Sequence, residues 1–218
     1  PASNTLSWRW VAGLQTVGKT YLATSENIAR FTNGRFAPKG LATVATIPTE
    51  MPVCAAQPLP KVAHFDAQTP AFLLLTPEDL HPESLLGAST KINGAGMLFD
   101  PETLGGENAR AFVAGAVHDA AERVGNNFKC PAHVLNNLDG ASLIAQARET
   151  GAKQIITAYA PVGPVADALA RIAPSLASAG IPLVHIRRAW DERFWPHATK
   201  GFFPFKERIP KILQDMGI

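Results

Sequence analysis

The sequence lacks several features that would place it in a broad class at once. It has no run of about eighteen apolar residues, which a membrane-spanning helix needs. No basic stretch leads into an apolar one near the N-terminus, as it does in a signal peptide. The only two cysteines among the 218 residues, Cys54 and Cys130, lie far apart. We therefore expect a soluble, cytoplasmic protein whose thiols stay reduced.

Motifs of metalloenzymes and hydrolases are also missing. The six histidines never stand at metal-ligand spacing, and no Gly-x-Ser-x-Gly nucleophile elbow occurs. Gly94-Ala95-Gly96 and Gly105-Gly106 follow expected strands, yet neither completes a dinucleotide fingerprint or a Walker loop. We interpret both glycine groups as turns rather than phosphate cradles, and we predict no metal site.

The composition is that of a folded protein with a sizeable core, since 46% of the residues are hydrophobic and 17% are charged. From residue 71 onward, apolar runs alternate with amphipathic stretches. This alternation predicts an α/β fold with a five-stranded, doubly wound and mostly parallel sheet. The expected strands are 71–75, 96–99, 132–135, 154–158 and 182–186. The expected helices are 77–86, 107–125, 140–150, 165–179 and 205–216.

Two shorter regions precede the α/β pattern. Residues 1–36 carry tryptophans and two helical patches, 4–12 and 25–31, and are too short to hold a core alone. Residues 37–70 contain six prolines and few periodic positions, which is typical of an extended linker. The sequence therefore predicts three parts: a helical segment 1–36, a proline-rich linker 37–70 and an α/β domain 71–218.

The most informative residues lie in the expected helix 4–12. Four residues make about one helical turn, so Asn4 and Trp8 share a face and can meet the same ligand. An amide offers both a donor and an acceptor to a ligand nitrogen, and indole is an easily oxidised side chain. Trp10 lies about 200° around the helix from Trp8 and therefore points in another direction.

This stretch, Ser3-Asn4 followed by Trp8-Arg9-Trp10, resembles the S-N-x-x-x-W-x-W-x-A signature of the DNA photolyase and cryptochrome family. The resemblance implies that residues 1–36 end an FAD-binding helical domain. It implies further that Asn4 binds the flavin of FAD, and that Trp8 is the electron donor to the flavin. The family's other flavin contacts would precede Pro1, so we expect this chain to be a fragment that is inactive alone.

The α/β region also resembles that family, at the end of its antenna domain. The matching strings are residues 151–159, 182–185 and 201–206, which follow the last two strands and the exit loop. The resemblance implies an antenna-like, Rossmann-like domain at 71–218, placed after the flavin segment instead of before it. Residues 161–167, where many members contact a folate, are mostly apolar here, so the antenna chromophore stays open.

Taken together, the resemblance implies a deoxyribodipyrimidine photolyase, a lyase that repairs pyrimidine dimers by blue-light-driven electron transfer from reduced FAD. Its partner would be DNA with pyrimidine lesions, and Trp10 would contact the lesion or pack. Two alternatives stay open: a cryptochrome-type photoreceptor, and a non-catalytic α/β module that binds a nucleotide or a partner.

Two further segments suit ligand contact. The basic and aromatic segment 187–211 suits either nucleic-acid contact or packing between domains. Residues 157–163 leave the carboxyl end of an expected strand, where open α/β sheets place their ligands, and form an expected pocket wall. The sequence leaves the oligomeric state open.

Overall fold

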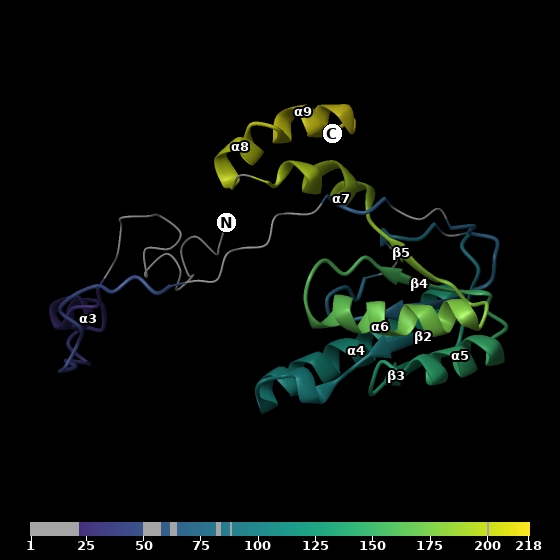
Figure 1. Ribbon diagram of the computed structural model, residues 1–218, viewed down its shortest axis with the longest axis horizontal. Helices are drawn as coiled ribbons and strands as arrows, with labels where there is room; N and C mark the ends of the chain where they lie inside the picture. The colour runs from purple at the N-terminus through teal and green to yellow at the C-terminus, as the bar shows by residue number, and fades with distance from the viewer. Residues whose placement is uncertain (1–21, 50–57, 62–64, 82–83, 88, 200) are drawn as a thin grey trace. The chain divides into compact units, whose positions relative to one another are not determined.

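Figure 1 shows the computed structural model, which describes residues 22–49, 58–61, 65–81, 84–87, 89–199 and 201–218. The chain divides into two compact units. One consists of residues 1–58 and 200–207, and the other of residues 59–199 and 208–218. The domain boundaries expected from the sequence stay a prediction.

The described part of the first unit holds two short helices, α3 (Ser25–Phe31) and α8 (Phe202–Lys206). The Thr24 side-chain oxygen begins α3, because it accepts a hydrogen bond of 3.1 Å from the backbone N–H of Asn27. A left-handed Gly34, with φ of 73°, follows the end of α3. The structure confirms the helix predicted at residues 25–31.

The second unit is built on a five-stranded sheet in the order β3-β2-β1-β4-β5, and every pair of neighbouring strands is parallel. All five residues of the central strand β1 are buried, as expected for an apolar strand covered on both faces. The predicted fold class, an α/β fold with a five-stranded parallel sheet, is confirmed. The strands are β1 (Ala71–Leu75), β2 (Ile92–Leu98), β3 (Ala132–Leu135), β4 (Gln154–Ala158) and β5 (Leu183–Ile186).

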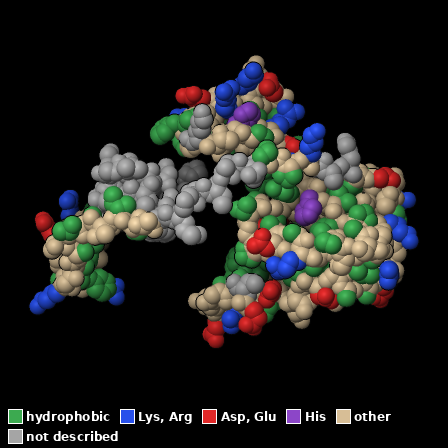
Figure 2. All heavy atoms as spheres, in the orientation of Figure 1, with side chains coloured by type: hydrophobic (Ala, Val, Ile, Leu, Met, Phe, Trp, Pro, Cys, Tyr) green, Lys and Arg blue, Asp and Glu red, His purple; other side chains and the backbone are tan. Residues whose placement is uncertain are grey.

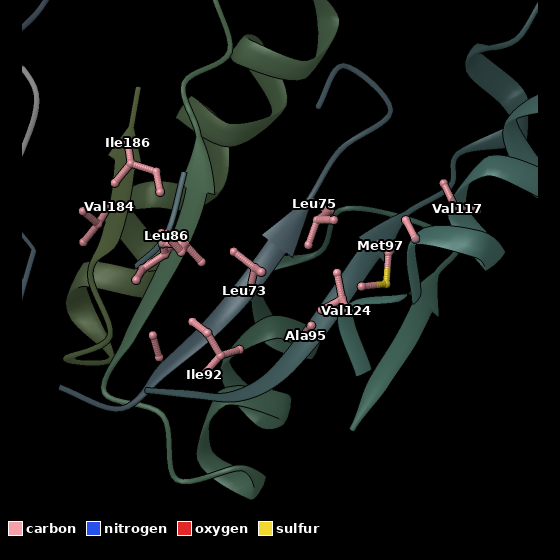
Figure 3. Close-up of a cluster of buried hydrophobic side chains, with 13 residues drawn as sticks. Leu73, Leu75, Leu86, Ile92, Ala95, Met97, Val117, Val124, Val184 and Ile186 are labelled. Atoms are coloured by element: carbon pink, nitrogen blue, oxygen red, sulfur yellow. The ribbon is translucent and has the colours of Figure 1, made fainter. Parts of the chain in front are cut away.

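One face of the sheet is covered by α4 (Glu107–Phe128), which follows β2. Val117 and Val124 of α4 are fully buried and pack in one cluster with β1 and β2 side chains such as Leu73 and Met97 (Figure 3). These buried α4 positions are seven residues apart, which places them on the same face of the helix.

The opposite face is covered by α5 (Gly140–Glu149) and α6 (Pro164–Ser178). Their buried leucines, Leu143 and Leu169, join Phe72 of β1 in a second core cluster. Because β1 sends alternate side chains to the two clusters, this single strand connects both halves of the core. Helices on both faces of a parallel sheet make the fold doubly wound.

The structure corrects the interpretation of Gly94-Ala95-Gly96 as a turn, because all three residues lie inside β2. A β-carbon on Gly94 would lie 2.6 Å from Thr150 Cγ2, and one on Gly96 would lie 2.6 Å from Leu135 Cδ1. Phe72 crowds both positions as well. The glycines therefore make room for neighbouring side chains against the sheet, and β2 begins four residues before the predicted start.

The helix predicted at residues 77–86 is wrong, since the described residues between β1 and β2 contain no α-helix. Asp79 instead closes a turn, its N–H bonding the carbonyl of Thr76 at 3.0 Å. Its carboxylate pairs with Arg188, which follows β5: Arg188 Nη2 donates to Asp79 Oδ1 at 2.8 Å. Arg188 Nε also donates to Ser84 Oγ at 2.9 Å. Side-chain hydrogen bonds from Arg188, which is distant in the sequence, thus hold the connection between β1 and β2 in place.

After β5 come α7 (Ala189–Phe194) and the 3-10 turn η3 (Trp195–His197). The helix predicted at residues 205–216 is divided, because α8 ends at Lys206 and α9 (Ile209–Asp215) begins after a turn. Pro210 occupies the first turn of α9, where its missing N–H costs nothing. In the part of the chain that the structure describes, no helix has the length and apolarity that crossing a membrane would take.

Candidate functional site

The carboxyl edge of the sheet is the part of this fold best suited to bind a ligand. The chain runs from β1 outward to β2 and β3, then returns to the other side of β1 for β4 and β5. Connections on the two sides of this reversal leave toward opposite faces of the sheet. They therefore part at the strand ends and leave a crevice, the usual ligand position in open α/β sheets.

A hollow of about 150 Å³ lies at this edge. Its walls come from the ends of β1 and β2, from the loop after β3 and from the first turns of α6. Most of the wall is apolar, while Asp100 and Arg171 each contribute a charged group. The lining residues are Pro77, Leu98, Asp100, Leu138, Pro164, Val165, Ala168 and Arg171.

The N-terminus of α6 forms one wall of the hollow. Gly163 precedes the helix with φ of 129° and ψ of −172°, a conformation that residues with a β-carbon rarely adopt. Pro164 fills the first turn, and no side chain of the described residues caps the first N–H groups of α6. Those N–H groups and the helix dipole give this wall a positive partial charge. Val165, Ala168 and Arg171 follow at intervals of three and share one helix face.

The carboxylate of Asp100 stands at the end of β2 and is half-buried. Its Oδ1 accepts a hydrogen bond of 3.1 Å from the N–H of Glu102, which begins the 3-10 turn η2 (Pro101–Thr103). This bond fixes the carboxylate beside the hollow. Neither Asp100 nor Arg171 was singled out from the sequence. An acidic residue directly after a predicted strand was the available signal for Asp100.

The other half of the same edge, after β4 and β5, is filled by side chains. The rings of Tyr159 and Trp195 meet edge to face with centroids 5.7 Å apart, and Tyr159 meets His185 at 6.4 Å. The guanidinium of Arg187 lies over the Tyr159 ring at 4.9 Å. Arg187 Nη2 also donates to the carbonyl oxygen of Pro60 at 2.7 Å.

Arg187 and His185 are polar groups inside this filled half. Only 5% of the Arg187 side chain is exposed, and Arg187 Nε bonds Glu192. Burial lowers the pKa of His185. Within the described residues, three buried atoms here have no hydrogen-bond partner: Thr157 Oγ1, His185 Nδ1 and Arg187 Nη1. Because Thr157 and His185 are paired across β4 and β5, two of these atoms come from directly adjacent positions.

Two arginines of the basic segment 187–211 are bound within the α/β unit. The Arg187 side chain is buried and Arg188 is hydrogen-bonded to Asp79. Neither guanidinium is therefore wholly available for contact with another molecule. In the space-filling view, Lys/Arg and Asp/Glu side chains both appear over α7 and α9 (Figure 2). Internal bonding thus accounts for two of the cations that suggested nucleic-acid contact.

A metal centre finds no support in the part of the chain that is described, because those residues contain no cluster of three or more His, Cys, Asp or Glu. Cys130 is half-buried, and burial raises the pKa of its thiol, which disfavours a reactive thiolate. The FAD contact Asn4 and the redox and lesion candidates Trp8 and Trp10 lie outside the described residues. Their roles stay predictions, as does FAD binding.

Comparisons with known proteins identify no family for this chain. No protein-family model and no curated protein matches the chain. A solved structure of E. coli tRNA N6-threonylcarbamoyladenosine dehydratase in complex with AMP aligns with a TM-score of 0.29 and 20% identity. The match covers 55% of this chain and 51% of that enzyme's chain, so about half of the enzyme is spanned.

This finding contradicts the function predicted from the sequence. The aligned protein is a tRNA-modifying dehydratase and not a photolyase or cryptochrome. We therefore withdraw light-driven DNA repair, lyase activity and photoreception as functions of this chain. The likeness is too low for the dehydratase's activity to be carried over, and the motif around Trp8 stays a resemblance only.

Proposed function

We propose that the α/β unit of this chain binds a nucleotide at the carboxyl edge of its sheet. The observation that carries the proposal is the hollow of about 150 Å³ at the reversal of strand order, with an uncapped helix N-terminus in its wall. Each part of a nucleotide, the base, the ribose and the phosphate, has a matching group there.

The base suits the apolar wall. Leu98, Leu138, Val165 and Ala168 all line the hollow, so a flat ring placed there would remove apolar surface from water. Sites for whole drug-sized ligands measure about 300–1,000 Å³. The hollow is smaller than that, so it would hold the ring and leave the sugar and phosphate at its mouth.

The ribose suits Asp100. In dinucleotide-binding α/β folds, a carboxylate about twenty residues after the glycine-rich turn accepts hydrogen bonds from the ribose hydroxyls. Asp100 stands just beyond the end of β2, beside the hollow. A carboxylate has two oxygens and accepts several hydrogen bonds at once.

The phosphate suits the N-terminus of α6 and Arg171. Uncapped N–H groups and the helix dipole attract an anion, and a guanidinium adds bidentate hydrogen bonds to phosphate oxygens. The turn after β1, at Thr76 to Asp79, contains no glycine and begins no described α-helix. Because a pyrophosphate normally sits at that turn, the site favours a mononucleotide over a dinucleotide.

The test is calorimetric titration of the purified chain with AMP, FMN, NADH and FAD. We expect AMP or FMN to bind more tightly than the dinucleotides. FAD belongs in the panel because the motif at Asn4 and Trp8 predicts it, and FAD as the tightest binder would contradict the mononucleotide site.

Variants locate the site. Arg171→Glu should weaken mononucleotide binding about tenfold or more, because it replaces a phosphate donor with a like charge. Ala168→Phe should abolish binding by filling the hollow. The matched control is Arg148→Glu, an exposed charge reversal on α5 that does not line the hollow. Equal affinity in Arg171→Glu, Ala168→Phe and the control would refute the site.

A further inference from the structure

Strand β3 presents an open edge of the sheet. Among the described strands it pairs with β2 alone, and its N–H and C=O groups alternate between β2 and the outside. Bonds such as Ala95 N–H to the Pro131 oxygen show that residues 131, 133 and 135 face β2. The backbone groups of Ala132 and Val134 therefore point outward, where a further strand can bond to them.

Two hollows lie beside this edge, between β3 and α5. One has a volume of about 320 Å³ and the other about 230 Å³. The larger is lined by Val134, Leu135, Asn136, Asn137, Asp139, Ser142, Leu143 and Gln146. The smaller is lined by Phe72, Asn93, Pro131, His133, Gln146, Glu149 and Thr150. Gln146 lines both, so the two hollows adjoin and follow the direction of the strand.

The chemistry of the hollows favours a donor of hydrogen bonds with positive charge. Each contains one carboxylate, Asp139 in the larger and Glu149 in the smaller, and neither is lined by a Lys or Arg. Gln146 Oε1 is buried and has no hydrogen-bond partner among the described residues. A buried acceptor without a partner costs free energy that an incoming N–H group would recover.

Asp139 stays charged over a wide pH range. Its carboxylate accepts bonds from Ser142, through the backbone N–H at 2.9 Å and the hydroxyl at 2.8 Å, at the start of α5. These bonds lower the pKa of Asp139. The larger hollow therefore keeps its negative charge at physiological pH.

The outer edge of β3 and the two hollows beside it together form a groove. We propose that this groove binds an extended, basic peptide segment of a partner protein, which adds as a strand to the outer edge of β3. Its backbone bonds to Ala132 and Val134, while Lys or Arg side chains at alternate positions enter the two hollows. Alternate side chains of a strand are about 6.6 Å apart. In this binding mode backbone bonds give affinity and alternating pockets give specificity.

The probe is a short fluorescein-labelled peptide in which lysine alternates with threonine, and anisotropy measures its binding to the full chain. The matched control peptide has glutamate in place of lysine. We expect binding of the lysine peptide alone, weakening as salt is raised. Equal binding of both peptides would overturn the proposal, as would no binding of either.

Two variants separate charge from strand addition. Asp139→Asn with Glu149→Gln should weaken binding about tenfold or more while keeping the helix cap, because asparagine caps as well as aspartate. Val134→Pro removes an outward N–H without removing a bond to β2, and should abolish binding, whereas Val134→Ala should not. Circular dichroism and urea midpoints check that each variant folds. Full binding by folded Val134→Pro would overturn strand addition.

A second copy of this chain is the other possible occupant of the edge. If gel filtration shows a dimer that Val134→Pro dissociates, and the peptide fails to bind, the edge belongs to the dimer and the proposal is wrong. Nucleotide titration of the same variants should be unchanged, because the groove and the hollow at α6 share no lining residue.

Discussion

The two halves of the sheet's carboxyl edge begin from the same geometry and end differently. Beside β1, β2 and β3 the edge is hollow, with Asp100 and Arg171 in its wall. Beside β4 and β5 the equivalent space is packed by Tyr159, Trp195 and the buried guanidinium of Arg187. A segment later in the chain decides the difference, because Trp195 comes from the turn after α7. Later segments therefore line both halves of the edge, but they leave a hollow only in the half that α6 borders.

The largest expected effect on stability comes from removing the Arg187 side chain from the packed space beside β4 and β5. Arg187→Ala removes bonds to Pro60 and Glu192 and the contact with the Tyr159 ring. We expect the free energy of unfolding to fall by about 3 kcal/mol, because truncating this buried side chain leaves a cavity and removes its hydrogen bonds. Urea denaturation measures it, with the exposed Arg193→Ala as control, for which we expect less than about 0.5 kcal/mol. Equal losses in the two variants would show that the filled half is not held by Arg187.

A smaller effect is expected at the open half. Gly163→Ala places a β-carbon at φ of 129°, although no atom lies within 4 Å of it. The cost is therefore backbone strain alone, about 1–2 kcal/mol. Gly105→Ala is the matched control, because it has equally open surroundings and no positive φ. If thermal unfolding gives the two variants the same stability, the turn before α6 adopts another conformation.

The smallest expected effect is a pH dependence of the folding stability, caused by His185 in the packed space beside β4 and β5. Burial lowers the pKa of His185, so the unfolded chain binds a proton at this site more readily than the folded one. The contribution of the neutral His185 ring to the free energy of unfolding is complete above the pKa of the unfolded state, about 6.5, and it is lost as the pH falls below that value. Urea midpoints between about pH 7.5 and pH 5 should fall less in His185→Phe than in the parent. An identical slope would assign the acid sensitivity to other groups.

Local patterns predicted much of the fold. The predicted strands 71–75, 132–135 and 154–158 agree with β1, β3 and β4, because short runs rich in apolar residues between turns are typical of strands. Errors arose where tertiary contacts override local preference. Gly94 and Gly96 suggest a turn but lie in β2, under Phe72 and its neighbours. Residues 77–86 form no described helix, because Arg188 holds them by side-chain bonds.

The candidate site was not predicted from the sequence. The sequence motif points to Asn4, Trp8 and Trp10, which lie outside the described residues, and the function predicted from this motif is contradicted. Asp100 and Arg171 are far apart in the chain and carry no motif. Only the expectation that residues 157–163 form a pocket wall pointed toward the edge where the hollow lies. Its own lining begins at Pro164, immediately after that segment.

The sequence by itself determined an α/β chain with buried strands and helices between them, because burial needs only the right spacing of apolar side chains. The tertiary structure alone decided which strand ends stay open and which are covered. It also decided that Gln146 lines two hollows and that its amide oxygen has no hydrogen-bond partner within the described ranges. The physical reason is that these properties depend on contacts between residues distant in the chain, which no local pattern records.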